Sequence, residues 1–484
     1  MSPLPTSAPD DAAAGSNDAR LPPSLSRDLR RRLGPSGFIE EPDRLLAYES
    51  DALTTIRGVP LAVTLPATRD ELCATVRLLY EAGVPFVPRG AGTGLAGGAV
   101  ARSAVLVVTT RLDRILGVDP AERLAVVEPG VVTDAISAAA APYGLRYLPD
   151  PASASACTIG GNVATNSGGP HCLKHGVTSD HVVALEVVLP DGTTLELDRG
   201  ESGGLDLAGL FIGSEGTFGI ASSITVRLVP RPEAVRTFLA LFGGVSDAGR
   251  AVTEILEAGV LPVALEIIDG TTIRAVEASV YAAGLPTDTG AALVVECEGS
   301  EEEAEEQMSV ALAAVQAAGP REVRLAATES DRARVWRARK NAFGALGRLG
   351  PDVMLQDAVV PRTELPTLLP RIEEVAERHD LQLANFFHAG DGNLHPNIVF
   401  DRRDPDQARR VNAACREILD LCVRAGGTIT GEHGVGLDKL KFMPLVFGEP
   451  ELEAMRSLKR AFDPTGICNP GKVVPSPPSG GGRA

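Results

Sequence analysis

Three things are scarce or missing in this 484-residue sequence, and each absence excludes a class of protein. The seven cysteines are scattered and form no CxxC pair, which excludes a ferredoxin-type iron–sulfur cluster and indicates reduced thiols in a cytoplasmic protein. No stretch approaches the ~20 apolar residues of a membrane span. Basic residues are outnumbered, 46 Lys and Arg against 63 Asp and Glu, so nucleic acid and anionic membranes are unsuitable partners. An anionic substrate must therefore be attracted by local charge.

The two ends of the sequence predict solvated tails. Residues 1–23 are rich in Ala, Ser, Pro and Asp and contain no apolar core, so we expect a disordered tail rather than a signal peptide. The acidic residues Asp10, Asp11 and Asp18 also argue against a mitochondrial transit peptide. Residues 474–484 predict a second tail. Hydrophobic residues make up 44% of the whole sequence, which is enough to form the cores of two or three domains.

Two glycine-rich segments, PRGAGTGLAGG (88–98) and CTIGGNVATNSGG (157–169), are the strongest local signal. Dense glycine removes Cβ atoms where backbone N–H groups must approach a ligand closely, and phosphate is the commonest such ligand. Neither segment runs into a helix-forming sequence, so the GxGxxG pattern of Gly92, Gly94 and Gly97 does not predict a Rossmann site. The P-loop pattern GxxxxGK[ST] is missing as well. Flexible surface loops are the alternative, but the flanking apolar strands favour a nucleotide cofactor held in another way.

The pattern of residues 46–232 alternates short strands with helices. A helix is expected at 69–81, and strands at 181–189 and 193–197 flank the hairpin-turn pair Asp191-Gly192. This order predicts one α+β domain with the cofactor between two lobes.

After Pro232 the pattern changes to two strand–helix–strand units. They span 237–268 and 291–326, which predicts an antiparallel sheet backed by helices, like a ferredoxin-type fold, that covers the cofactor as a lid. The acidic run Glu301–Glu306 fits the N-terminus of a helix, where carboxylates interact favourably with the macrodipole.

Two histidines, His388 and His395, are separated by AGDGNL with apolar runs outside. If that segment is a hairpin loop, the two imidazoles lie across from each other on adjacent strands and can share a ligand. Glu432 in GEHGVG offers a third ligand, and two histidines with one carboxylate leave a position open, which suits Zn²⁺ or another divalent ion. Taken alone, H-x6-H fits two structural histidines better than a metal pair. Asp391 is assigned to the turn rather than to the metal.

His433 is the candidate general base. A neutral imidazole with a pKa near 6.5 accepts a proton at working pH, which a lone carboxylate does less well. The alternative is a histidine that only supports its loop.

Six segments together carry a resemblance to a known family. They are PRGAGTGLAGG, residues 149–182, IGSEGTFGI (212–220), HAGDGNLHPN (388–397), GEHGVGLDK (431–439) and NPGK (469–472). In this order they resemble the FAD-linked 2-hydroxyacid dehydrogenases of the vanillyl-alcohol-oxidase fold, with its PCMH-type FAD-binding domain. That family includes glycolate oxidase flavin subunits and the D-lactate and D-2-hydroxyglutarate dehydrogenases, of which the first are the most similar. The resemblance covers about residues 46–473.

The resemblance implies an α+β architecture in which an antiparallel cap domain covers a two-lobed FAD domain. The implied parts are a FAD-binding domain at 24–232, a substrate-binding cap at 233–425 and a C-terminal segment at 426–473 that returns to the flavin domain.

Noncovalent FAD is the implied cofactor, because relatives that attach FAD through the first glycine loop have His where this chain has Thr93. The implied FAD contacts are Arg89, Gly90, Ala91, Gly92, Thr93, Gly94, Gly160, Gly161, Asn162, Asn166, Ser167, Gly168, Gly213, Glu215, Gly216, Ile220 and Asn469.

For the chemistry, the resemblance assigns the clamp on the substrate carboxylate to Arg339, which spacing alone does not separate from the other arginines of its helix. Lys340 is a weaker candidate partner, and Trp336 is expected to pack in the core. The divalent metal held by His388, His395 and Glu432, expected to be Zn²⁺, would polarise the substrate hydroxyl. These roles imply the oxidation of a small D-2-hydroxy acid to its 2-oxo acid.

Some positions depart from the family pattern. His175 stands where relatives commonly have Tyr, which leaves the role of that side chain open. Relatives that act on hydroxyglutarate have polar side chains near the positions of Phe343 and Leu355, so the apolar residues here favour glycolate or D-lactate.

Without an iron–sulfur motif, the chain must pass electrons to a separate acceptor. Candidates are an iron–sulfur partner subunit, an electron-transfer flavoprotein or a quinone, and partner subunits would allow a peripheral position at the membrane. Two alternatives stay open: the same fold acting on another alcohol, such as a sugar lactone or D-2-hydroxyglutarate, and a non-catalytic flavin-bearing subunit.

Overall fold

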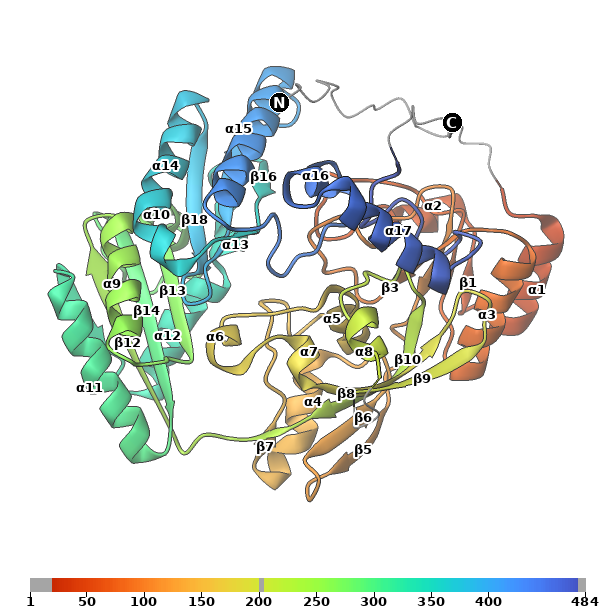
Figure 1. The fold of residues 1–484 in the computed structure, drawn as a ribbon, viewed down its shortest axis with the longest axis horizontal. Coiled ribbons are helices and arrows are strands. Elements are labelled where there is room, and N and C mark those ends of the chain that lie inside the picture. The colour runs from red at the N-terminus through yellow and green to blue at the C-terminus, as the bar shows by residue number, and fades with distance from the viewer. Residues whose placement is uncertain (1–19, 200–203, 478–484) are drawn as a thin grey trace.

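A four-stranded, a five-stranded and a nine-stranded sheet organise the chain in a computed structural model that describes residues 20–199 and 204–477. The two smaller sheets lie together on one side of the molecule and the large sheet on the other (Figure 1). Most of the two predicted tails falls outside the described residues. Within them, Leu21 packs against a core cluster and the first helix begins at Pro23.

The four-stranded sheet has the order β1-β2-β4-β3, in which β2 and β3 run parallel to β4. Its strands are β1 (Phe38–Ile39), β2 (Ala62–Thr64), β3 (Phe86–Arg89) and β4 (Val105–Val108). Helices α1 (Pro23–Leu33) and α3 (Arg69–Glu81) bury their leucines against it. The predicted helix at 69–81 is confirmed, and its first turn is capped by Thr68, whose hydroxyl accepts the N–H of Glu71. Short helices α2 (Pro42–Leu45) and η2 (Leu46–Tyr48) precede β2.

The five-stranded sheet is antiparallel, with the order β5-β6-β10-β8-β9. Its strands are β5 (Ile115–Asp119), β6 (Leu124–Val127), β8 (Val182–Val188), β9 (Thr194–Asp198) and β10 (Ile220–Arg227). The predicted hairpin at Asp191-Gly192 joins β8 to β9, with the Asp191 carboxylate accepting the N–H of Thr193. Other elements of this region are α4 (Thr133–Ala140), η3 (Ala141–Tyr143), β7 (Leu145–Arg146), α6 (Cys172–His175), α7 (Thr178–His181), α8 (Leu207–Phe211) and β11 (Val229–Pro230).

The second glycine-rich segment differs from the expectation, because it contains a short helix, α5 (Ile159–Thr165). Ile159, Asn162 and Val163 are buried on this helix and anchor it to the five-stranded sheet. Tertiary packing therefore outweighs the low helix propensity of its two glycines. The helix ends at Asn166, whose left-handed backbone (φ 51°) turns the chain away. The first segment forms a loop without a helix, as predicted.

The nine-stranded sheet contains the predicted ferredoxin-type arrangement. The strands of the two strand–helix–strand units lie in the order β15-β12-β14-β13, all antiparallel. They are β12 (Ala234–Phe242), β13 (Ala264–Asp269), β14 (Ala291–Gly299) and β15 (Glu322–Leu325), with helices α9 (Val245–Glu257) and α11 (Glu301–Ala317) between them. The acidic run begins α11, where Ser300 and Glu303 form a capping box, as expected.

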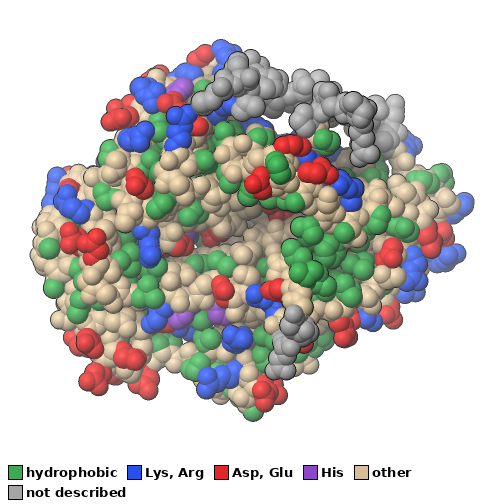
Figure 2. Space-filling view, in the orientation of Figure 1, with side chains coloured by type: hydrophobic (Ala, Val, Ile, Leu, Met, Phe, Trp, Pro, Cys, Tyr) green, Lys and Arg blue, Asp and Glu red, His purple; other side chains and the backbone are tan. Residues whose placement is uncertain are grey.

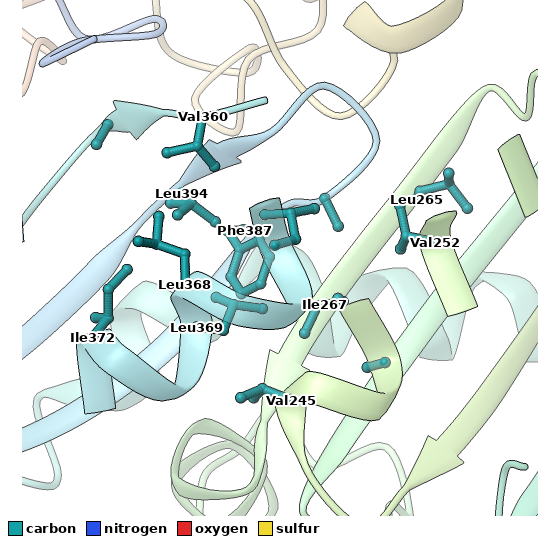
Figure 3. Close-up of a cluster of buried hydrophobic side chains, with 14 of the residues drawn as sticks. Val245, Val252, Leu265, Ile267, Val360, Leu368, Leu369, Ile372, Phe387 and Leu394 are labelled. Carbon is teal, nitrogen blue, oxygen red and sulfur yellow. The ribbon is translucent and has the colours of Figure 1, made fainter. Parts of the chain in front are cut away.

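Further strands extend this sheet beyond β13. They are β16 (Asp352–Leu355), β17 (Ala358–Val359), β18 (Gln382–His388), β19 (Asn393–Leu394) and β20 (Pro396–Phe400). Helices α9, α11 and α14 (Leu365–Arg378) cover one face, and side chains of α9, α14 and β13 meet Phe387 of β18 in its core (Figure 3). The elements α10 (Gly270–Glu277), α12 (Glu329–Lys340) and α13 (Ala342–Leu346) supply the opposite face, and η4 (Arg362–Glu364) leads into α14.

The C-terminal part crosses from the large sheet to the smaller ones. Helix α15 (Pro405–Arg424) packs on α14, and η5 (Leu440–Phe442), α16 (Met443–Val446) and α17 (Glu449–Phe462) follow it. Near its end the segment joins the edge of β3, since Phe86 donates its N–H to Ile467 and accepts that of Asn469. Among the residues that the structure describes, the helices are all too short or too polar to cross a lipid bilayer.

Candidate active site

A cavity between the two smaller sheets is bordered by both glycine-rich segments. The loop after β3, helix α5 and the start of β10 form its walls, and Glu432 and His433 of the C-terminal segment also line it. The surface of the molecule is hollowed near its centre (Figure 2).

Most of the predicted FAD contacts line this cavity. They are Arg89, Gly90, Ala91, Gly92, Thr93, Gly94, Gly160, Gly161, Asn162, Ser167, Glu215, Gly216 and Ile220. The other four, Asn166, Gly168, Gly213 and Asn469, are not among its lining residues.

Gly92 shows why the first loop needs glycine. Its φ is +75°, and a Cβ built there would lie 2.2 Å from the Arg89 guanidinium. That guanidinium donates to the Ser50 carbonyl at 2.8 Å. Burial lowers the pKa of Arg89, although the nearby Asp51 carboxylate opposes this effect. A side chain at position 92 would therefore displace a partly buried cation from the cavity wall.

Glu215 and Asn469 connect the loops to the C-terminal segment. The Glu215 carboxylate accepts the backbone N–H groups of Val435 and Gly436 at 2.6 and 2.8 Å. Asn469 donates to the carbonyls of Gly98 and Glu215 at 3.1 and 2.7 Å. Direct contact of Asn469 with FAD stays a prediction. In the structure Asn469 links the C-terminal segment to the loop at Gly98 and to the segment at Glu215.

Three imidazoles converge on one carboxylate oxygen beside this cavity. The Nε2 atoms of His388, His395 and His433 lie 3.4, 3.3 and 3.7 Å from Oε1 of Glu432. Gly168 borders the same group, because a Cβ built there would lie 3.1 Å from Oε2 of Glu432. The sequence-predicted metal ligands and the predicted base are thus brought together.

The hairpin that carries two of these histidines has a register different from the expected one. His388 at the end of β18 pairs with Asn393 rather than with His395, which stands between β19 and β20. The two rings nevertheless lie only 5.2 Å apart, centroid to centroid, in an edge-on arrangement. His395 thus lies two residues beyond the position that pairs with His388, at the break between β19 and β20.

Two buried carboxylates stand behind the imidazoles, and sequence reasoning missed both. Glu266 of β13 lies 2.6 Å from Nδ1 of His388, and Asp357 lies 3.9 Å from Nδ1 of both His395 and His433. Glu266 is within hydrogen-bond distance, and such a partner on the far nitrogen fixes the tautomer of a metal-binding histidine and aims its other nitrogen. Nδ1 of His395 instead lies 3.3 Å from the Gln356 carbonyl, so Asp357 acts on the imidazoles of His395 and His433 through its charge alone. An isolated acid in the apolar stretch around Glu266 was the available signal, because a buried charge must have a partner.

The charges of the cluster shift one another. Burial opposes the charged form of His388, but Glu266 and Glu432 outweigh it and hold the pKa of His388 well above its usual value. Burial also opposes the charge of Glu432, yet His388 and His395 hold its pKa well below the usual range. In contrast, burial lowers the pKa of His433 to about 4 despite the nearby Asp357 carboxylate. His433 is therefore a neutral imidazole at neutral pH.

Arg339 points from α12 into the cluster and is only 6% exposed. One of its terminal nitrogens lies 2.5 Å from Glu266 and 3.4 Å from Nδ1 of His388, and its Nε has no hydrogen-bond partner. The structure thus separates Arg339 from Arg334, which lies on the surface of the same helix. Lys340 is half exposed.

Trp336 and His175, two other residues singled out in the sequence, each contact a carboxylate of β14. The expected core position of Trp336 is confirmed, and its Nε1 donates to the buried Glu296 at 2.6 Å. His175 lies 2.7 Å from Glu298, and the Arg146 guanidinium binds the same carboxylate. Although burial opposes its charge, His175 and Arg146 lower the pKa of Glu298 to about 2.

Solved structures share the fold. The chain superimposes on p-cresol methylhydroxylase with a TM-score of 0.79, covering 93% of this chain and 96% of that one at 18% identity. An alkyldihydroxyacetonephosphate synthase gives a TM-score of 0.74 over 94% of this chain and 86% of that one at 19% identity. At such identities the likeness concerns the fold alone, and it confirms the predicted α+β FAD-binding architecture.

Sequence comparisons define the family. Residues 60–198 match the description "FAD binding domain", and residues 231–473 match "FAD linked oxidases, C-terminal domain". The chain therefore belongs to the FAD-linked oxidases and is a flavin-dependent oxidoreductase, which confirms the predicted resemblance.

Several curated relatives cover nearly the whole chain. The glycolate oxidase subunit GlcD of Escherichia coli (strain K12) is 43% identical over 94% of this chain and 91% of its own length. The subunit of the same name from Bacillus subtilis (strain 168) is 39% identical over 93% of this chain and 97% of its own length. A D-lactate dehydrogenase of Archaeoglobus fulgidus is 34% identical, covering 85% of this chain and 91% of that protein.

Proposed function

We propose that this protein oxidises a small D-2-hydroxy acid, glycolate or D-lactate, to the 2-oxo acid with noncovalently bound FAD. The convergence of Glu432, three imidazoles and Arg339 beside the glycine-lined cavity carries the proposal. The names of the relatives, glycolate oxidase subunit and D-lactate dehydrogenase, point to the same substrates.

A divalent metal fits the cluster. Tetrahedral Zn²⁺ with bonds near 2.05 Å holds its ligand atoms about 3.4 Å apart. The Nε2 atoms of His388 and His395 lie 3.4 and 3.3 Å from Oε1 of Glu432, close to that spacing. These three residues would hold the ion, with Glu266 supporting His388 from behind. A bound ion would lower the pKa of a coordinated hydroxyl.

Arg339 is the proposed clamp for the substrate carboxylate. Glu266 neutralises one side of the guanidinium, while its buried Nε lacks a partner and can donate to a bound anion. Because the chain as a whole carries a net charge of −17, an anionic substrate has to be attracted by a local positive charge, and Arg339 supplies one.

His433 is the proposed base. Its imidazole borders the cavity and is neutral at working pH, so Nε2 can take the hydroxyl proton of the substrate. When bound, FAD supplies the acceptor for the hydride that leaves the substrate carbon. Thr93, in the loop where covalent relatives have His, supports noncovalent binding.

Electrons would leave through a separate acceptor. All seven cysteines are free and scattered, so the chain offers no cluster of its own. Because the most similar relatives quoted are named as subunits, an iron–sulfur partner subunit is the first candidate, before an electron-transfer flavoprotein or a quinone. Such a partner would give the protein a peripheral position at the membrane. For the domain organisation, we propose that the FAD-binding domain ends at residue 232 and that the substrate-binding cap ends at residue 425.

Anaerobic mixing tests the proposal. The purified yellow protein is mixed with glycolate, both lactates and both 2-hydroxyglutarates, and the flavin band at about 450 nm is followed. Bleaching by glycolate or D-lactate is expected. Bleaching by 2-hydroxyglutarate or a sugar lactone alone would assign another alcohol, and a flavin that no donor reduces would identify a non-catalytic subunit.

A further inference from the structure

Asp357, between β16 and β17, is fully buried and accepts hydrogen bonds from Lys439 and from the short turn at 430–434. Its carboxylate accepts the hydroxyl of Thr430 at 2.6 Å and the Nζ–H of Lys439 at 2.9 Å. It also accepts the N–H groups of Gly431, Glu432 and His433 at 3.1, 3.3 and 2.9 Å. Two of these three N–H groups belong to residues whose side chains face the cavity.

Consecutive backbone N–H groups that point inward form a concave site for an anion. In this turn the anion is a side chain of the protein, supplied from the large sheet. Gly434 closes the turn with a φ of +84°, and its N–H is bound by the Thr430 hydroxyl at 3.0 Å. The turn is thus fixed at both ends.

A second metal ion is a poorer explanation of this carboxylate. Asp357, His395 and His433 offer ligand atoms within 4.8 Å of one another. However, Lys439 already places a buried ammonium 2.9 Å from the carboxylate, and His395 presents its Nε2 to Glu432. The positive charge that Asp357 requires is therefore provided by the chain itself.

We infer that Asp357, with Lys439 as its counter-charge, is a positioning residue. It holds the Thr430–Gly434 turn so that the Glu432 carboxylate and the His433 imidazole face the cavity. The metal part of this inference rests on the proposed function, whereas the ordering of the turn does not.

The test variant is Asp357→Asn, whose amide would turn an N–H donor toward the donors of the turn. A second variant, Asp357→Asn with Lys439→Met, removes the unpaired buried cation and serves if the single variant does not fold. The matched control is Asp463→Asn. Asp463 is equally buried and accepts the N–H groups of Ile467 and Cys468 together with Nζ of Lys459, but from a different turn.

Two quantities are measured on the full-length, FAD-loaded proteins. The first is affinity for Zn²⁺ alone, by competition with a chelator, and we expect it to weaken by about 10–100-fold in both Asp357 variants and by less than about twofold in Asp463→Asn. The second is amide hydrogen exchange of residues 430–434, expected to accelerate only in the Asp357 variants.

The two measurements separate the possible failures. Unchanged exchange in the turn would overturn the inference, whatever the metal does. Faster exchange with unchanged Zn²⁺ affinity would overturn it as well, because the turn would then not position Glu432. Wild-type protein that binds no Zn²⁺ would remove the proposed metal site, and exchange alone would then decide on Asp357.

Discussion

His171 joins the loop after α5 to the large sheet, and its charge makes that junction depend on pH. Its Nδ1 lies 2.8 Å from Asp150 and its Nε2 lies 3.6 Å from Glu296 of β14, while its ring rests against Trp336. Burial opposes the charge, but the two carboxylates outweigh it and raise the pKa of His171 to about 10. Two other cations compete for these carboxylates: Arg332 binds Glu296 at 2.8 Å, and Lys340 lies 4.0 Å from Asp150.

The sign and size of the effect follow from linkage. The pKa of His171 is raised on folding, so its stabilisation is complete below the unfolded pKa of 6.5 and is lost as pH rises toward about 10. Each pH unit in that window is worth about 1.36 kcal/mol, so about 3 kcal/mol should be lost between pH 6.5 and 9. For a domain of about 150–250 residues that unfolds cooperatively, a loss of about 3 kcal/mol lowers Tm by roughly 6–12 °C.

The assay compares the Tm of the wild type with that of His171→Gln at pH 6.5 and 9, since ionisations that both proteins share cancel in the difference. The wild-type advantage should shrink by several degrees at the higher pH. His379→Gln is the control, because His379 pairs with Glu417 at 3.1 Å on the surface, where water screens the charge. An equal advantage of the wild type over His171→Gln at both pH values would refute the reasoning.

Other expectations concern the site itself. Glu266→Gln should weaken Zn²⁺ affinity about 10–100-fold, because His388 loses the carboxylate behind it. It should also cost about 3–5 kcal/mol of stability, because Arg339 stays buried without its counter-charge. Chelator competition and thermal melts measure the two effects, and wild-type values would contradict the expectation. His433→Ala should slow flavin reduction about 10²–10⁴-fold in anaerobic stopped flow, and an unchanged rate would remove its role as base. Trichloroacetic acid precipitation should leave a colourless pellet, and a yellow pellet would show covalent flavin.

Much of the fold could be read from local patterns. The helix at 69–81 has a capping Thr68 and a regular apolar face, and the ferredoxin-type units repeat a clear order of elements. Helix α5 could not be predicted, because its glycines lower helix propensity and only the packing of Ile159 and Val163 reveals why it forms. The pairing of β18 with β13 is a long-range contact without a local signature.

The residues of the site also fall into those that the sequence pattern indicates and those that only the structure reveals. His388, His395, Glu432 and His433 stand in glycine-rich segments whose pattern indicates function, and the structure brings them together. The carboxylates behind them are single acids within strands or beside them, so sequence alone does not show which partner each one meets. Arg339 was separable from its neighbours only once α12 was placed against β13 and β18, since burial rather than spacing distinguishes it.

The links between the first glycine loop and the C-terminal segment have a consequence for biosynthesis. Asn469 binds the carbonyl of Gly98, 371 positions earlier, and Leu437 donates its N–H to Ala96. A nascent chain on the ribosome cannot form these contacts until residue 469, beyond α17, has been translated, however early the first sheet folds. Because Glu432 and His433 also line the cavity, its lining is completed only when nearly the whole polypeptide has been made.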